Sequence, residues 1–301
     1  MTIACAWSQE SPSTAGAVLP TGKGGTLNTD AGGVWSYDSF RGSWRSELTS
    51  RWGDGPVSLE VIAPSAETAA TCAVVYVLPT QSNGSQHGDP LGDVIIHHLA
   101  DRLAVIFVYV HFAHPTWFGE NPLRPTFRPD LAIKEDVVPT IERRFRADPR
   151  PSHRLLIGFS KSGWGAVCML ARSPDFWGYA ATWDAPLLCE RSEYGLWDTD
   201  SYGTLESFER QRPPVLLAIA SCKLHAPTRI ILAGECIPSP DTAGPFKDRS
   251  HVKAEHMLLD ALGIPHVYRP HMRYQHHWNS GWFHHLAEEL VQLSRRTPLE
   301  Q

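Results

Sequence analysis

The chain has 301 residues, 42% of them hydrophobic, and its formal net charge is −5 with histidine neutral. This length suits one large domain or two small ones, and the hydrophobic fraction allows a sizeable core. The acidic balance and the lack of a basic stripe argue against nucleic acid as a partner. No stretch approaches the roughly 18 apolar residues of a membrane helix, so we expect no membrane partner either.

The amino terminus and the cysteines indicate the compartment. The first residues, MTIACAWSQESPSTAG, contain no Lys or Arg and only a brief apolar run, unlike a secretory signal. The six cysteines lie far apart and form no C-x-x-C motif, which disfavours a disulfide framework and a zinc site. We therefore expect a cytoplasmic protein with reduced thiols, no metal and no cofactor.

Composition also divides the chain. Residues 8–34 are rich in Ser, Thr, Gly, Ala and Pro, and their GKGG sequence lacks the spacing of a phosphate-binding loop. We expect a partly mobile lead-in over residues 1–45 and a single domain over residues 46–301. Within that domain, residues 186–214 fall between two predicted core strands and are interpreted as a lid-like insertion before the penultimate strand.

From residue 46 onward, predicted strands alternate with predicted helices. Apolar runs rich in Val and Ile predict buried strands. The strand predictions are ELTSRW and VSLEVIAP, then residues 72–79, 103–110, 154–159, 179–183 and 229–234, and finally PHVYR. The helix predictions are residues 89–102, 129–145 with a bend near Pro139, 162–174, 250–263 and 281–296. The alternation predicts an α/β fold, with a mostly parallel central sheet and helices on both faces.

The stretch RLLIGFSKSGWGAV contains two serines, Ser160 and Ser162, between a predicted strand and a predicted helix. This is the setting of a nucleophile elbow, a tight turn in which the residues two before and two after the nucleophile must be small. Around Ser160 these residues are Gly158 and Ser162, whereas around Ser162 one of them is Trp164. Sterics therefore favour Ser160 as the nucleophile.

The longer stretch GFSKSGWGAVCMLARSPDFW resembles the elbow and following helix of the putative-esterase group of α/β-hydrolases. This group includes S-formylglutathione hydrolase and esterase D-like proteins. The segments EDVVPTIERRFRADPRPSHRLLIGFS and LGIPHVYR also look like that group, so the resemblance covers roughly residues 46–295. It implies an α/β-hydrolase fold and a Ser–His–acid triad.

In this fold the catalytic histidine lies in a loop after the last strand. The sequence RYQHHWNSGWFHH offers His276 and His277 there. The family pattern of His, any residue and an aromatic residue matches His276-His277-Trp278 and selects His276, with His277 as the alternative. His284 and His285 fall inside the predicted helix, so we expect them to be packing or surface residues.

The acid of the triad stays open at this point. The family usually places it where this chain has Ile237, which is a departure from the pattern. Asp184 is the first candidate, because it follows a predicted strand and sites form at the carboxyl edge of a parallel sheet. The other candidates are Asp248, Asp241 and Glu235.

An oxyanion hole needs two backbone N–H donors. The amide of Lys161 follows the nucleophile, and the resemblance places the second donor at Gln81, after Pro79-Thr80 where the family has His-Gly. We expect a serine hydrolase that cleaves a small-molecule carboxylic ester or thioester through an acyl-enzyme on Ser160. The alternatives are an acyltransferase with the same triad and a non-catalytic binding protein of the same fold. A homo-oligomer is compatible with the sequence.

Overall fold

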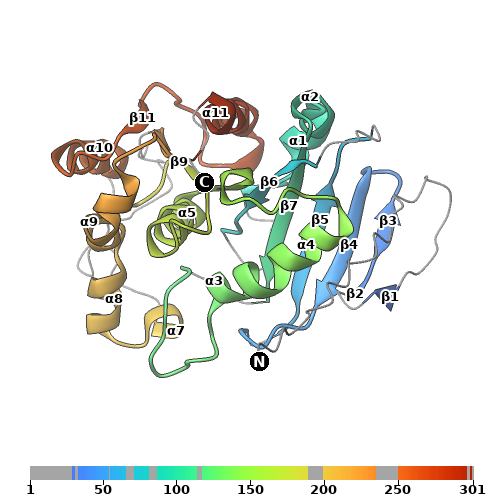
Figure 1. Cartoon of the computed structure of the whole chain (residues 1–301), viewed down its shortest axis with the longest axis horizontal. Helices are drawn as coiled ribbons and strands as arrows, with labels where there is room; N and C mark the ends of the chain where they lie inside the picture. Colours follow the sequence, from blue (N-terminus) through green and yellow to red (C-terminus); the bar gives the residue numbers. More distant parts are fainter. Residues whose placement is uncertain are drawn as a thin grey trace, which may run out of the picture.

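The computed structural model describes residues 29–30, 33–53, 55–65, 71–80, 87–113, 117–188, 199–234, 250–296 and 299. Most of these residues build a nine-stranded sheet with helices on both faces (Figure 1). The architecture is the predicted mixed α/β fold with a large central sheet.

The strands coincide closely with the predicted apolar runs. They are β3 (Ser36–Asp38), β4 (Ser43–Leu48), β5 (Val57–Ile62), β6 (Ala73–Val77), β7 (Val105–Phe112), β8 (Arg154–Phe159), β9 (Tyr179–Trp183), β10 (Ile230–Ala233) and β11 (His266–Arg269). Their spatial order is β11-β10-β9-β8-β6-β7-β5-β4-β3. All neighbours from β7 to β11 are parallel, and β5, β4 and β3 extend the sheet in antiparallel fashion. A separate antiparallel pair joins β1 (Thr29–Asp30) and β2 (Gly33–Val34).

Two apolar cores lie on opposite faces of the sheet. One contains α1 (Gly92–Ile96), α2 (Leu99–Leu103) and α11 (Trp282–Arg296). The other contains α4 (Val138–Arg144), α5 (Ser160–Arg172), α9 (Pro213–Leu224) and α10 (His251–Ala261). Alternate residues of β6 serve the two cores: Tyr76 belongs to the second core and Val75 to the first. Strands buried on both faces explain the continuous apolar runs in the sequence.

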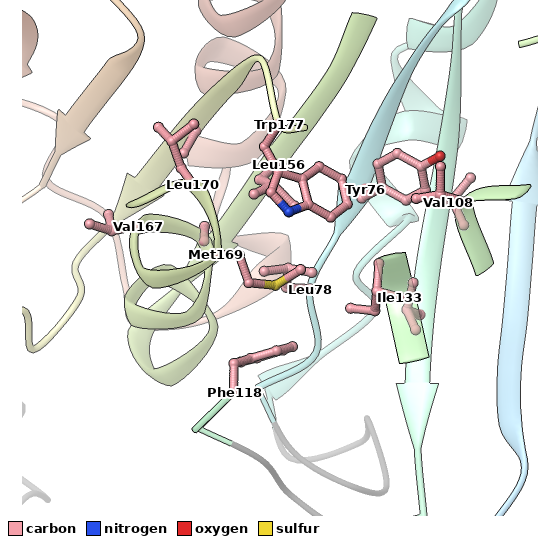
Figure 2. Packing of buried hydrophobic residues seen from close by; sticks show 14 of the residues in the cluster. Tyr76, Leu78, Val108, Phe118, Ile133, Leu156, Val167, Met169, Leu170 and Trp177 are labelled. Atoms are coloured by element: carbon pink, nitrogen blue, oxygen red, sulfur yellow. The ribbon is translucent and has the colours of Figure 1, made fainter. Parts of the chain in front are cut away.

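Figure 2 shows the second core, where Met169 of α5 lies near Leu78, just after β6, and Ile133. Tyr76 of β6 meets the indole of Trp177 edge to face, with ring centroids 5.5 Å apart. Phe118 closes this core, and its ring lies so near Gly165 that a Cβ there would come within 2.2 Å of it. The glycine therefore lets α5 approach its neighbours closely.

Two predicted helices are interrupted. The helix expected over residues 89–102 is divided into α1 and α2 at His98, whose φ of 50° is left-handed. The helix expected over residues 129–145 begins with α3 (Pro129–Leu131) and passes through a π-helical segment, η2 (Ala132–Val137), before α4. Pro139 has no N–H to donate to the preceding turn, which accounts for the irregularity at the predicted bend.

The sheet begins earlier than the predicted domain. The boundary at residue 46 falls inside β4, so β3 and the start of β4, which we assigned to the lead-in, are sheet strands. The composition was misleading here because β3 is an edge strand in which the successive residues Ser36 and Tyr37 are both exposed, so it lacks the apolar run of a buried strand. Residues 1–28 lie outside the described part of the chain.

Residues 186–214, which we interpreted as a lid-like insertion, lie between β9 and β10. The described part of this segment contains α7 (Thr199–Tyr202) and α8 (Leu205–Gln211), while residues 189–198 are outside the described ranges. Two short 3₁₀ segments, η3 (Pro151–His153) and η4 (Trp278–Ser280), precede β8 and α11. Among the described helices, none is long and apolar enough to cross a membrane.

Candidate active site

The turn from β8 into α5 has the geometry of a nucleophile elbow. Ser160 is the first residue of α5 and has a left-handed φ of 51°. The chain folds back so sharply that a Cβ on Gly158 would lie 2.4 Å from the carbonyl oxygen of Ser162. No side chain can occupy position 158 without moving the backbone, which is the steric requirement that the sequence pattern predicted.

Ser162 forms hydrogen bonds inside the elbow turn. It is fully buried, and its hydroxyl donates to the carbonyl of Phe159 at 2.9 Å and accepts from the amide of Phe159 at 3.1 Å. Trp164 is also buried, and its indole N–H donates at 2.9 Å to the hydroxyl of Tyr202, the last residue of α7 in the predicted insertion. Of the two serines, only Ser160 is partly exposed.

His276 and Asp184 form a close pair. His276 Nδ1 lies 2.7 Å from Asp184 Oδ2, and the side-chain exposures are 34% for the histidine and 2% for the aspartate. A buried carboxylate at this distance fixes the imidazole with its proton on Nδ1 and leaves Nε2 as a base. Asp184 follows β9 with a left-handed φ of 46°, and its amide donates to Ala233 of β10 at 2.9 Å.

The position of Asp184 relative to Ser160 follows from the sheet register. Phe159 of β8 pairs with Trp183 of β9, so Ser160 and Asp184 leave two adjacent strands at the same level. The Phe159 ring also meets the His276 ring edge to face, with centroids 4.9 Å apart. The structure thus brings the three predicted residues to one edge of the sheet.

Aromatic side chains hold the loop that carries His276. The indole N–H of Trp183 donates to the carbonyl of Met272 at 2.9 Å, and its ring stacks on Trp282 of α11 at 4.9 Å. The buried Trp278 packs edge to face on Phe159 at 4.6 Å. Large buried rings on both sides restrict the loop and help to fix the imidazole.

The alternative histidine, His277, has a different role in the structure. Its Nδ1 accepts the amide of Asn279 at 3.2 Å, and its carbonyl accepts the Ser280 hydroxyl and the Trp282 indole N–H. His277 therefore caps the short segment η4 at the start of α11. Its hydrogen bonds do not include Asp184 among the residues that the structure describes.

The sequence analysis missed one histidine at this edge. The His87 ring lies 6.0 Å from the His276 ring and 5.8 Å from the Phe159 ring, centroid to centroid. Burial lowers the pKa of His87, and repulsion by His276 lowers it further. The adjoining Asp89 amide donates to Asn279 Oδ1 at 2.8 Å across 190 residues of sequence. Nothing local in the sequence signals this contact.

The amide of Lys161, one of the two predicted oxyanion donors, lies in the first turn of α5, where the helix dipole is positive. Its ammonium lies 5.7 Å from the centroid of the Trp117 ring. The other predicted donor, Gln81, and the alternative acids Glu235, Asp241 and Asp248 lie outside the described residues.

Comparisons with known proteins agree on the fold. A family profile described as "Putative esterase" matches residues 111–293. The S-formylglutathione hydrolase of Agrobacterium tumefaciens has a TM-score of 0.66 at 15% identity, covering 90% of this chain and 98% of that one. FphF, a fluorophosphonate-binding serine hydrolase of Staphylococcus aureus, has a TM-score of 0.64 at 14% identity, covering 83% and 97%.

A third solved structure also has a similar fold. The enterobactin esterase of Shigella flexneri has a TM-score of 0.54 at 14% identity, covering 84% of this chain and 59% of that one. A comparison with curated proteins gives no match. Because the family profile spans more than half of the chain, this protein belongs to that esterase family of α/β-hydrolases and is a serine hydrolase that acts on esters.

Proposed function

We propose that the protein cleaves a small carboxylic ester or thioester through an acyl-enzyme on Ser160. The observation that carries this proposal is the 2.7 Å contact between His276 and the buried Asp184, beside a serine in an elbow turn. Such a pair keeps the imidazole in the tautomer that accepts the serine proton.

The reaction has two balanced steps. Ser160 Oγ attacks the ester carbonyl while His276 Nε2 takes the hydroxyl proton, and the same proton then passes to the leaving alcohol or thiol. Water next attacks the acyl-enzyme, giving one proton to His276, and the acid leaves as Ser160 recovers its proton. Asp184 stabilises the imidazolium that forms in each step and stays ionised throughout.

The negative oxygen of each tetrahedral intermediate needs N–H donors. The Lys161 amide suits this role, because it follows the nucleophile in the first turn of α5. We assign the second donor to the Gln81 amide on the family resemblance. Removing one such donor typically costs about 100- to 1000-fold in kcat.

A fluorophosphonate probe tests the proposal directly, because it reacts covalently only with an activated serine. The protein is labelled and the adduct is located by peptide mass spectrometry, with Ser160→Ala, Ser162→Ala and His276→Ala treated in parallel. We expect an adduct on Ser160 in the wild type and in Ser162→Ala, and little labelling in His276→Ala.

Steady-state hydrolysis of p-nitrophenyl acetate provides the second readout. Ser160→Ala is expected to lose the activity, and His277→Ala, a matched change of the neighbouring imidazole, is expected to keep most of it. An adduct on Ser162, or equal hydrolysis by wild type and Ser160→Ala, would overturn the assignment. Acceleration of turnover by an added alcohol, with ester formation, would identify the acyltransferase alternative.

A further inference from the structure

Helices α1 and α11 contact each other on the face of the sheet opposite α5 (Figure 1). Three metal-ligating side chains meet near this contact. They are Asp93 of α1, His97 directly after the end of α1, and His284 near the start of α11. None of them takes part in the proposed ester chemistry. We propose that they bind a divalent transition metal ion, with Zn²⁺ as the best match to two imidazoles and one carboxylate.

The distances suit such an ion. The ligand atoms of the three residues all lie within 4.8 Å of one another, and Asp93 Oδ2 is 3.2 Å from His284 Nδ1. A tetrahedral Zn²⁺ with bonds of about 2.0–2.1 Å holds neighbouring donor atoms about 3.3 Å apart. The Asp93–His284 pair therefore already has the required separation, and His97 brings a third donor atom within 4.8 Å of both.

The charge and burial of Asp93 also favour a bound cation. The residue is only 6% exposed, and a buried carboxylate is costly without a positive partner. Its contacts in the described chain are the ring and amide nitrogens of His284, and no Lys or Arg forms an ion pair with it there. Arg102 of α2 pairs instead with Glu288 of α11 at 2.8 Å.

A simple ion pair between Asp93 and a protonated His284 does not account for His97. The His97 ring stacks on the His284 ring, with centroids 4.0 Å apart and an angle of 29° between the planes. The two rings therefore lie side by side next to the Asp93 carboxylate. Imidazole nitrogens coordinate a metal, and a bound cation would supply positive charge beside Asp93.

Three protein ligands leave a fourth position for water. The ion would join α1 to α11, and α11 directly follows the loop that carries His276. We therefore expect it to strengthen the fold next to the catalytic loop. This assignment departs from our expectation that the protein holds no metal and that His284 only packs or faces solvent.

A second cluster must be controlled for in any test. His256, Asp260 and His266 also bring ligand atoms within 4.8 Å of one another. There, however, His256 Nδ1 and His266 Nε2 lie 2.7 Å apart, a direct hydrogen bond, and the other ring nitrogen of His266 contacts the Ile264 carbonyl at 2.8 Å. These donors already bind each other at a spacing too short for an ion between them.

The test uses the untagged full-length chain after treatment with a chelator. Zn²⁺ alone is titrated calorimetrically, and the thermal unfolding midpoint is measured with and without the ion. We expect one site in the wild type, a raised midpoint with Zn²⁺, and binding weakened by about 100-fold or more in His97→Ala, since even outer residues of metal sites are worth 10- to 100-fold. His284→Ala serves as the second ligand variant.

Two controls make the result specific. His98→Asn changes the exposed neighbouring imidazole to a residue that tolerates its left-handed backbone, and His256→Gln disables the second cluster. Both are expected to bind Zn²⁺ as the wild type does. A wild type without a site, equal binding by wild type and His97→Ala, or a loss confined to His256→Gln would each overturn the proposal.

Discussion

Ser160 and Asp184 each directly follow one member of a pair of residues that face each other in adjacent strands. Phe159 of β8 and Trp183 of β9 are in register, and the next residue of each strand has a left-handed backbone, with φ values of 51° and 46°. Left-handed backbone is costly for residues other than glycine and persists where the surrounding structure enforces it. Two such turns side by side place a hydroxyl and a carboxylate at one sheet edge.

If Asp184 orients His276, replacing it by asparagine removes the charge but keeps the shape. The asparagine can present its amide N–H to the ring and so favour the wrong tautomer. We expect Asp184→Asn to lower kcat by about 10⁴-fold with a much smaller change in KM, as the corresponding change does in a serine protease triad. Steady-state kinetics on p-nitrophenyl acetate measure both constants.

Asp175→Asn is the matched control, since this carboxylate is 77% exposed and pairs with Lys223 on the surface. It should leave kcat unchanged. An Asp184→Asn enzyme whose kcat stays within about tenfold of the wild type would exclude Asp184 as the acid. The other candidate acids, Glu235, Asp241 and Asp248, would then be tested by replacing each with its amide.

Ser162→Ala should affect stability more than chemistry. The substitution deletes a buried hydroxyl that bonds both backbone groups of Phe159, and it leaves a buried N–H without a partner. We expect the free energy of unfolding in urea to fall by about 1–3 kcal/mol. Ser160→Ala, at a partly exposed position, should cost less. A folded Ser162→Ala protein that no longer labels on Ser160 would contradict this division of roles.

Trp183 should act as a positioning residue for the catalytic loop. Trp183→Phe keeps a ring against Trp282 but removes the N–H that donates to the Met272 carbonyl. We expect a destabilisation of about 1 kcal/mol, together with a kcat reduced by about tenfold and a nearly unchanged KM. The contrast between kcat and KM separates loop positioning from loss of substrate binding.

Trp177→Phe provides the comparison, because Trp177 is equally buried but belongs to the core on the other face of the sheet. Its replacement should lower stability without lowering kcat. If both variants lose kcat to the same extent, the effect of Trp183 is a general loss of stability. If neither does, the Met272 hydrogen bond does not position the loop.

Much of the fold could be predicted because the central strands are buried on both faces. A strand such as β8 must then be continuously apolar, and its limits, Arg154 and Phe159, are those predicted from the sequence. The hairpin of β3 and β4 was harder to recognise, since one of its sides faces solvent and its composition resembles that of a loop. Helix breaks such as that at His98 depend on local backbone turns that no periodicity reveals.

The elbow and the histidine loop could be located because sterics and chain order restrict them to few residues. The pairing of His276 with Asp184 was left open, since it depends on the register between β8 and β9 and on the path of a loop 92 residues away. His87 and the Asp93–His97–His284 cluster were not anticipated for the same reason. Both sites bring together residues from distant helices and loops, and the spacing of residues in the sequence does not predict such contacts.

Glu255 should make the stability of the protein depend on pH. It is fully buried in α10, its carboxylate oxygens have no hydrogen-bond partner in the described chain, and burial raises its pKa to about 8. His251, one turn earlier, and Cys168 of α5, whose pKa it helps to raise, are nearby titratable groups. In the unfolded chain the glutamate ionises near its ordinary pKa of 4.5.

Between about pH 4.5 and about pH 8, the folded protein therefore binds one proton that the unfolded chain has released. The contribution of this bound proton to stability is fully present below pH 4.5 and is lost as the pH rises toward 8. The free energy of unfolding falls by no more than about 1.4 kcal/mol per pH unit. Glu255→Gln mimics the protonated side chain at every pH. The free energy of unfolding of Glu255→Gln minus that of the wild type should increase with pH across this window and then level off.

Urea unfolding at about pH 5, pH 7 and pH 9 measures this difference. Glu206→Gln, which removes a well-exposed carboxylate of α8, corrects for the loss of one charge. A difference between wild type and Glu255→Gln that stays constant over the whole range would mean that Glu255 is ionised in the folded protein. It would then need a cationic partner, and the residues 235–249 that precede α10 contain Lys247 and Arg249 as the candidates to replace next.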